Sequence, residues 1–173
     1  MNTEQLKECM EEHGHDMFAF CKRLTGNISE AEDLFQDTFL KCMELGKEVD
    51  KERNPKGYLA TIAIQIWKNR KRKFAWRQRI AKTETLLEET IGDMECTSSS
   101  PEQMVMDREL RKLVQKAVAE LADQYRLPVY LYYTLELSVE EIAAVLHIPK
   151  GTVKSRLYKA RILLKKKLEV SVK

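Results

Sequence analysis

The stretch LSVEEIAAVLHIPKGTVKSRLYKAR, residues 137–161, decides the fold. Ser138 stands three residues before Glu141, which is the capping-box pattern that opens a helix. The helical spacing after this box predicts a buried face made of Ile142, Ala143 and Leu146. The chain then crosses HIPKG, residues 147–151, before a second helical pattern begins. Two helices joined by so short a connection follow the helix-turn-helix plan.

The second helix of this plan has an inner face and an outer face with different chemistry. Thr152 is its expected cap, and at 100° per residue the inner side collects Val153, Leu157, Ala160 and Leu164. The outer side and its flanks carry no acidic residue and are small, basic or aromatic: Lys154, Ser155, Arg156, Tyr158, Lys159, Arg161 and Ile162. Such a surface suits the DNA major groove, with residues 154–159 at base edges and Thr152, Arg156 and Arg161 at phosphates. The alternative is a basic hairpin that faces only solvent.

The longer stretch from residue 121 to residue 168 resembles a known DNA-binding domain. It is similar to domain 4 of bacterial sigma factors of the extracytoplasmic-function (ECF) group, within the sigma-70 superfamily, which reads the promoter minus-35 element. The resemblance implies that Lys154, Ser155, Tyr158 and Lys159 are minus-35 contacts. Response regulators of the LuxR type share a comparable domain, so the rest of the chain must distinguish the two classes.

The composition of the whole chain favours an all-α protein. The 173 residues are 43% hydrophobic and 33% charged, and they include only six Gly and four Pro, which is few for a sandwich or barrel. No run of about 18 apolar residues is present and the acidic N-terminus is unlike a signal peptide, so a cytoplasmic protein without membrane insertion is expected. The sequence contains no C-x-x-C pair of cysteines that could bind a metal, and it implies no cofactor. The chain has four cysteines, which are interpreted as free thiols: Cys9, Cys21, Cys42 and Cys96. Three of the four are expected to be buried or half-buried on helices.

The charges are arranged in blocks, although the net charge is only +3. Residues 1–46 carry ten acidic and four basic side chains, whereas residues 68–82 carry eight basic and none acidic. Residues 83–107 carry seven acidic and no basic side chains, and residues 147–173 carry nine basic and one acidic. We interpret these blocks as two surfaces that bind polyanions and one acidic surface that binds a basic partner, although each block alone could be a solvated helix face.

These blocks divide the chain into two helical modules and a linker. The first module is predicted over residues 1–82, the acidic Ser-containing linker over 83–107, and the second module over 108–173. The first module should hold three helices: one from Thr3 to about Leu24 interrupted near Gly14, one opened by a capping box of Ser29 and Glu32 and running to about Leu45, and one over residues 55–80. Helical periodicity resumes after Pro101 and continues past Pro128.

The helix that follows Ser29 has an acidic face with a leucine in its middle. That face carries Asp33, Gln36, Asp37, Leu40 and Glu44. Charges that set orientation around an apolar centre suit docking to a basic partner, although single exposed leucines are common. The stretch EAEDLFQDTFLKC, residues 30–42, also resembles the sigma-factor segment that binds the beta-prime subunit of RNA polymerase. The resemblance implies core polymerase binding by Asp33, Gln36 and Asp37, and the apolar centre of the face adds Leu40 to this predicted site.

The helix over residues 55–80 interleaves cations and aromatic residues, which suits single-stranded DNA. Its inner arc holds Trp67, expected in the core, and Trp76 is left unassigned. NPKGYLATIAIQIWKNRKRK, residues 54–73, resembles the minus-10 recognition and melting helix of the same family. The resemblance implies minus-10 DNA contacts by Tyr58, Thr61, Gln65, Lys68, Asn69 and Arg72. Tyr58, Gln65 and Asn69 replace the Trp, Asn and Asp common in the family, which keeps the role but leaves the minus-10 sequence open.

Together the two modules predict a sigma factor that binds core polymerase through its beta-prime and beta subunits and opens promoter DNA. It would have no catalytic centre and no small-molecule substrate, and the resemblance implies control by an anti-sigma factor. The acidic linker would run toward the RNA-exit path as a mimic of a nucleic-acid strand, although a disordered acidic spacer is the commoner alternative. One alternative is a stand-alone helix-turn-helix regulator. Another is an enzyme, but Cys9, His13 and His15 match no usual metal spacing and the serines at 98–100 have no His nearby in sequence.

Overall fold

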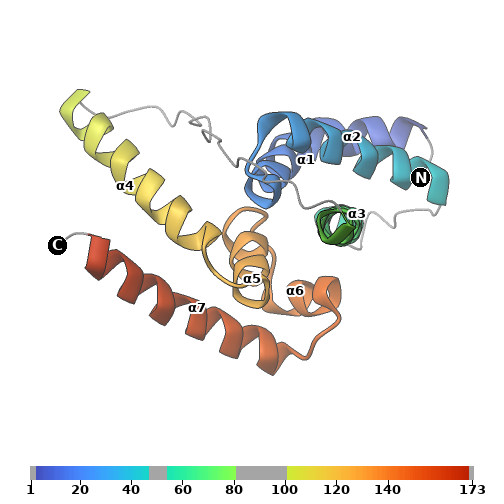
Figure 1. Ribbon diagram of the computed structural model, residues 1–173. Coiled ribbons are helices and arrows are strands. Elements are labelled where there is room, and N and C mark those ends of the chain that lie inside the picture. Colours follow the sequence, from blue (N-terminus) through green and yellow to red (C-terminus); the bar gives the residue numbers. More distant parts are fainter. Residues whose placement is uncertain (1–2, 47–53, 81–100, 172–173) are drawn as a thin grey trace.

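The computed structural model describes residues 3–46, 54–80 and 101–171, and within these ranges the chain forms helices and no strands (Figure 1). The seven helices are α1 Thr3–Thr25, α2 Ile28–Leu45, α3 Pro55–Ile80, α4 Pro101–Ala119, α5 Asp123–Tyr133, α6 Val139–Leu146 and α7 Lys150–Ser171. The predicted all-α class is therefore confirmed. Residues 83–100 of the predicted linker, which include Cys96 and the three serines, lie outside the described ranges, and residues 101–107 form the start of α4.

The first three helices pack around a shared apolar core. Met17 and Phe20 of α1, Leu34 of α2 and Leu59 of α3 are fully or almost fully buried there. The expected interruption of the first helix near Gly14 is wrong, because α1 runs unbroken from Thr3 to Thr25. A Cβ on Gly14 would lie 3.8 Å from Phe35 Cζ, so this part of α1 packs against α2. That packing outweighs the cost of about 1 kcal/mol for a helical glycine.

The start of α2 also differs from the prediction. The N-cap is Asn27, whose side-chain oxygen accepts a hydrogen bond from the Glu30 backbone N–H at 3.2 Å. Ser29 already lies inside the helix, so the predicted Ser29–Glu32 capping box is wrong. The turn occurs at Gly26, whose φ of +71° is a left-handed conformation that glycine adopts without strain. Helical geometry can therefore begin directly after Asn27.

The helix-turn-helix forms as predicted at its first helix and earlier than predicted at its second. Ser138 and Glu141 make both bonds of the capping box: Ser138 N–H donates to Glu141 at 2.7 Å, and Glu141 N–H donates to the Ser138 hydroxyl at 3.2 Å. The second helix, α7, begins at Lys150, so the expected cap at Thr152 is wrong. The carbonyl of Pro149 accepts the N–H groups of Thr152 and Val153 at 3.0 and 3.1 Å. The helical bonding thus starts at Pro149.

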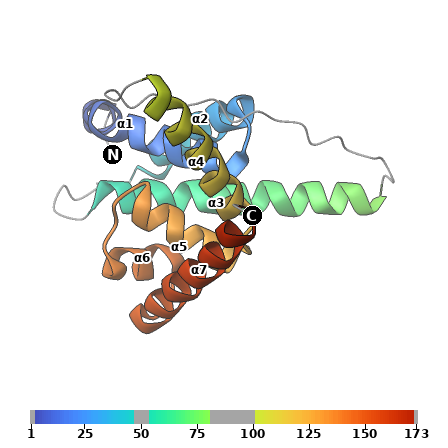
Figure 2. The same cartoon turned by 90° about the vertical axis from the view of Figure 1, so that its left-hand side faces the viewer.

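The first helical group, α1–α3, and the second helical group, α4–α7, form one body in which α3 occupies the middle. Figure 2 shows α3 as a long rod with α1 and α2 on one side and α5, α6 and α7 on the other. Buried side chains of both groups form a single cluster. At the crossing of α3 and α6, a Cβ added to Gly57 would lie 3.5 Å from Val145 Cγ2, so α6 lies directly on the first turn of α3. None of the helices in the described ranges is long and apolar enough to span a membrane.

Candidate nucleic-acid and partner interfaces

The outer face of α7 is cationic and open to solvent. Lys154, Ser155, Tyr158 and Lys159 are all exposed, and 66% of Tyr158 is accessible. The opposite face holds the helix down through Val153, Leu157 and Ala160, which are buried. Thr152 and Arg156 are half-buried beside this open strip. The structure thus gathers six of the seven predicted minus-35 residues along one side of α7.

Arg161, the seventh predicted residue, is held by aromatic side chains of α5. Its Nε donates to the Tyr133 hydroxyl at 3.2 Å, and its guanidinium lies 6.0 Å from the centre of the Tyr132 ring. The two tyrosines pack edge to face, with ring centres 4.9 Å apart. Sequence reasoning missed this aromatic support, because no helical periodicity links α5 to a residue 28 positions further on.

The acidic face of α2 is exposed as the sequence analysis expected. Asp33, Gln36 and Asp37 are exposed, and 52% of Leu40 is accessible in their midst. Met43, which the analysis did not single out, extends the apolar centre with 43% of its surface accessible. The i, i+3 spacing between Leu40 and Met43 was the signal that could have identified it.

Asp37 is also tied to the neighbouring helix. The guanidinium of Arg70, on α3, makes an ion pair and a hydrogen bond with the Asp37 carboxylate. Both side chains are partly exposed, so the pair lies at the rim of the acidic face rather than in the core. Arg70 therefore sets the orientation of a predicted polymerase contact. Helical periodicity could not predict this pair, because it joins two helices across 33 positions.

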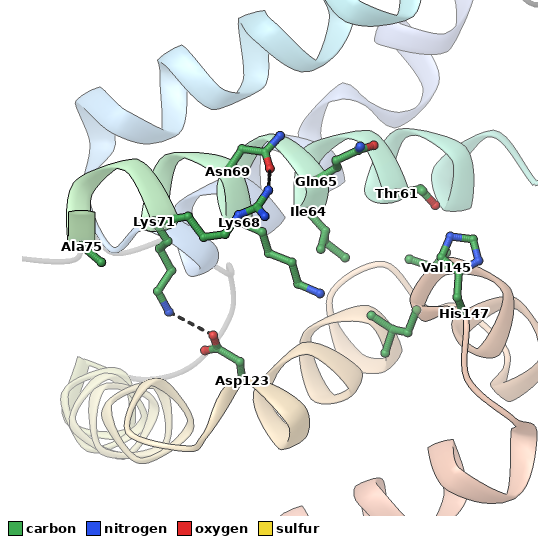
Figure 3. Close-up of a pocket in the computed structure, with 12 residues that line it drawn as sticks. Thr61, Ile64, Gln65, Lys68, Asn69, Lys71, Ala75, Asp123, Val145 and His147 are labelled. Atoms are coloured by element: carbon green, nitrogen blue, oxygen red, sulfur yellow. Dashed lines mark hydrogen bonds and ion pairs between the residues drawn. The ribbon is translucent and has the colours of Figure 1, made fainter. Parts of the chain in front are cut away.

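The outer face of α3 forms one wall of a cavity of about 780 Å³ (Figure 3). Five of the six predicted minus-10 residues line this wall: Thr61, Gln65, Lys68, Asn69 and Arg72. Arg72 donates a hydrogen bond to the side-chain oxygen of Asn69. The wall is thus polar and cationic over three turns of helix.

Tyr58, the sixth predicted minus-10 residue, does not line this cavity. Its ring is half-buried against the core, and its hydroxyl is buried without a hydrogen-bond partner in the described part of the chain. Burial raises the pKa of this hydroxyl, and the nearby Cys42 raises it further. Tyr58 is therefore separated from the other five residues.

The opposite wall of the cavity comes from the second helical group, which the sequence analysis did not place there. It is made by Asp123 at the start of α5 and by Val145, Leu146 and His147 at the end of α6. Lys71 of α3 donates a hydrogen bond to Asp123 Oδ2 at 3.0 Å across the gap (Figure 3). Burial raises the pKa of the Asp123 carboxyl, but the bonds and charges of Lys71 and Arg126 outweigh burial, so the net pKa is lowered. Asp123 is therefore an anion that faces a cationic helix.

The two tryptophans of α3 have opposite environments. Trp67 is buried, as expected, and its ring lies 4.6 Å from Lys71 Nζ and 5.5 Å from the Arg126 guanidinium. Trp76, to which the sequence assigns no role, has 65% of its surface accessible near the far end of α3. Trp67 is thus part of the contact with α5, and Trp76 is free of it.

The cysteines of the first three helices are buried thiols. Cys9, Cys21 and Cys42 are free and buried, which agrees with the sequence analysis. Burial raises the pKa of Cys21 and of Cys42 to about 12. Thiols with such pKa values are poor nucleophiles and metal ligands at neutral pH. Over the described ranges no three His, Cys, Asp or Glu side chains come together as a metal ion would require.

Comparisons with known proteins match two separate parts of the chain. The family model for sigma-70 region 2 matches residues 9–78, and the model for sigma-70 region 4 matches residues 111–164. The ECF RNA polymerase sigma factor SigW of Bacillus subtilis is 33% identical over 158 residues, which span 88% of this chain and 82% of SigW. SigL of Mycobacterium tuberculosis is 28% identical over 160 residues, or 90% of this chain and 84% of SigL.

The fold matches solved structures as well. The sigma factor RpoE of Bartonella quintana, crystallised with the anti-sigma factor NepR, superposes with a TM-score of 0.80 at 24% identity over 97% of this chain and 99% of RpoE. CnrH, solved with the cytosolic domain of CnrY, superposes with a TM-score of 0.67 at 18% identity over 98% of this chain and 90% of CnrH. The family models and the SigW match establish what the fold alone would not: the chain belongs to the ECF sigma factors, and it is a sigma factor of RNA polymerase.

Proposed function

We propose that this sigma factor divides its work between two domains, with residues 1–82 for core polymerase and the minus-10 element and residues 108–173 for the minus-35 element, and with residues 83–107 as the tether. The observation that carries this proposal is that the acidic α2 face and the cationic α7 face are both exposed and belong to different helical groups. Opposite charges on separate surfaces allow one protein to hold a basic enzyme and DNA at the same time.

The second domain would read duplex DNA through α7. Lys154, Ser155, Tyr158 and Lys159 would reach base edges in the major groove, because they line the exposed strip of the helix. Thr152, Arg156 and Arg161 would bind phosphates and fix the register of the helix. The hydrogen bond of Arg161 to Tyr133 supports this role, because it orients the guanidinium before DNA arrives.

The first domain would bind the displaced strand through α3. Thr61, Gln65, Lys68, Asn69 and Arg72 offer hydrogen bonds and positive charge along one face, which suits phosphates and unstacked bases. Tyr58 would act less directly, since its hydroxyl is buried, and would support the first turn of the helix. Unstacking each base step costs a few kcal/mol, so these contacts would have to offset that cost during opening.

Core polymerase would bind the acidic face of α2. Asp33, Gln36 and Asp37 would steer a basic surface of the enzyme, and Leu40 would supply the apolar contact at the centre. The catalysis would then come from polymerase, so the chain itself would not be an enzyme. A protein that acts with polymerase on promoters would work in the cytoplasm. The sigma factor RpoE, whose fold this chain matches, was crystallised with the anti-sigma factor NepR, which supports an anti-sigma factor as a further partner.

Transcription by purified components tests the proposal. The protein would be added to core polymerase with genomic fragments, and the 5′ ends of the transcripts would be mapped. We expect discrete start sites with the wild type and none with Asp37→Lys, because reversing this charge opposes docking. Asp107→Lys, the same change on the exposed surface of α4, is the matched control and should leave the start sites in place.

A stand-alone regulator would give a different result. It would leave core polymerase silent at every fragment, whatever the variant. Lys159→Ala should distinguish the roles of the two domains, because it should weaken promoter binding while leaving the affinity for core polymerase unchanged. Equal loss of both affinities would contradict the assignment of the faces.

A further inference from the structure

The cavity beside α3 changes in chemistry along its length. Figure 3 shows Ile64 and Val145 toward one end and the ion pair of Lys71 with Asp123 toward the other. Lys68 lies between the two ends, and its side chain reaches into the gap (Figure 3). One end is thus aliphatic, and the rest is charged. A ligand that fits the whole cavity must carry an apolar part and an anionic part.

We propose that this cavity is a binding site for a nucleoside monophosphate, with the base at the Ile64 end and the phosphate between Lys68 and Arg72. The cavity volume of about 780 Å³ lies within the range of roughly 300–1,000 Å³ that is usual for small-molecule sites. From Ile64 to Arg72 the helix rises by roughly 12 Å, at 1.5 Å per residue, so the base and the phosphate have separate places along it.

The charged part of the cavity has positive charge to spare for a phosphate. The Lys71 amine is neutralised by Asp123, whose carboxylate oxygen lies 3.0 Å away. Arg72 donates a hydrogen bond to the side-chain oxygen of Asn69, which carries no charge. No ion pair joins Lys68 to any residue in the described ranges. Two cations without a carboxylate partner suit a phosphate group, whose charge at pH 7 is close to −2.

The aliphatic end of the cavity suits a base better than a sugar. Ile64, Val145 and Leu146 supply hydrocarbon surface there, against which a planar ring can pack. Gln65 is exposed beside them, and its amide both donates and accepts hydrogen bonds, as the edge of a base requires. A sugar phosphate without a base would place hydroxyl groups against the hydrocarbon wall, which costs free energy.

His147 adds an independent indication of a ligand. It ends α6 with a φ of +55°, a left-handed conformation that glycine adopts without strain. A histidine is less stable than glycine in this conformation, yet its side chain lines the cavity and points toward Thr61 (Figure 3). Strain of this kind is typical of ligand-binding positions. The imidazole offers a hydrogen bond to the base or the ribose.

The site has a regulatory consequence that rests on the function proposed for α3. Lys68 and Arg72 are assigned both to the phosphate of the nucleotide and to minus-10 DNA. A bound nucleotide and the displaced strand would therefore compete for the same two side chains. Free nucleotide would then reduce promoter opening without any change in duplex binding by α7.

Calorimetric titration of the full-length protein tests the site directly. The probes are the four ribonucleoside monophosphates AMP, GMP, CMP and UMP. We expect at least one of them to bind with a Kd below about 1 mM, and inorganic phosphate and the matching free nucleoside to bind at least about tenfold more weakly, because each fills only one end. Binding by none of the four, or by inorganic phosphate as tightly as by the best nucleotide, would overturn the proposal.

Variants locate the binding within the cavity. Lys68→Ala should weaken the best nucleotide by about tenfold, because it removes a charged contact to the phosphate. Lys73→Ala removes the same charge from an exposed position of α3 outside the cavity, and it should change the affinity by less than about twofold. Equal affinities of these two variants would overturn the proposal.

His147→Gly separates binding from folding. The variant should melt at or above the wild-type temperature, since glycine relieves the left-handed strain, but it should bind the nucleotide about fivefold more weakly. Unchanged affinity in this stable variant would contradict the placement of the ligand against the His147 wall.

Competition with a single strand distinguishes this proposal from the minus-10 assignment. The probe is a fluorescein-labelled thymidine oligonucleotide of about 12 nucleotides. A saturating nucleotide should weaken its binding to the wild type several-fold. Strand binding that depends on Lys68, with no nucleotide binding, would overturn the nucleotide site and leave the minus-10 assignment standing. Nucleotide binding that depends on Lys68, with strand binding that does not, would support the site and contradict the minus-10 assignment.

Discussion

The outer faces of α3 and α7 are both cationic, but one is covered and the other is open. On α7, Lys154, Tyr158 and Lys159 face solvent on the free chain. On α3, the comparable face lines a cavity whose far wall carries Asp123 and His147. Two helix faces of similar composition therefore differ in their accessibility on the free chain. If α7 reads duplex and α3 binds the displaced strand, as proposed, the difference predicts that duplex is bound before single strand.

The largest expected effect concerns the support of the open face. Ile142 is fully buried beneath the helix-turn-helix, so Ile142→Ala should lower the free energy of unfolding by about 2–5 kcal/mol. Urea denaturation would measure the loss. Leu40→Ala, at an exposed position on α2, is the control and should change stability by less than about 0.5 kcal/mol. A cost for Ile142→Ala as small as the control's would contradict the packing described for this helix.

The next effect tests the open face directly. Lys159→Ala should weaken binding of the free protein to promoter duplex by about 1–3 kcal/mol, because it would remove a proposed major-groove contact. Lys68→Ala, on the covered face, should leave that affinity within about a factor of two, since the second helical group hinders access to it. Fluorescence anisotropy at fixed salt would compare the two. A loss of equal size in both variants would remove the distinction between the faces.

A pH experiment separates the two helical groups. Cys21 and Cys42 belong to the first group, and their pKa values are raised from 9.0 to about 12. The folded state then keeps protons that the unfolded state loses, so stability is full below pH 9 and falls between pH 9 and 12. The slope is up to about 1.4 kcal/mol per pH unit for each thiol. Thermal unfolding of wild type and Cys42→Ala from pH 8 to pH 10 should show a shallower fall in the variant. Parallel curves would refute the contribution of this thiol.

The smallest expected effect concerns the start of the helix-turn-helix. Ser138→Ala removes the side-chain acceptor of the capping box and should cost about 1 kcal/mol of stability. Hydrogen exchange of the α6 amides should then accelerate, while the α3 amides stay protected. Uniform acceleration across both helices would show that the covered and open regions unfold together.

Local patterns were sufficient to predict much of this fold. The bounds of α3 and the Ser138–Glu141 capping box followed from residues close in sequence, and both are seen. The start of α2 was misplaced because Asn27 with Glu30 and Ser29 with Glu32 have the same spacing, and only the turn at Gly26 decides between them. Rules based on residue spacing alone cannot decide which of two such capping patterns forms.

The relations between distant residues could not be predicted in this way. Asp37 with Arg70, Arg161 with Tyr133 and Lys71 with Asp123 join helices 28 to 52 positions apart, and they depend on how the helices pack. The exposed faces of α2 and α7 were predictable because they follow from the period of a single helix. The outer face of α3 is covered because α5 and α6 lie opposite it. Such tertiary packing leaves no periodic pattern in the sequence, so it could not be predicted.

Permanganate footprinting of the promoter complex tests the central claim most directly. This reagent oxidises unpaired thymines, so it reports opening separately from binding. With core polymerase and a mapped start site, the wild type should expose thymines near minus 10. Lys68→Ala should keep the duplex bound at minus 35 but lose most of that reactivity, whereas Lys159→Ala should lose both together. If Lys68→Ala opened the promoter as fully as the wild type, α3 would not be the helix that captures the displaced strand.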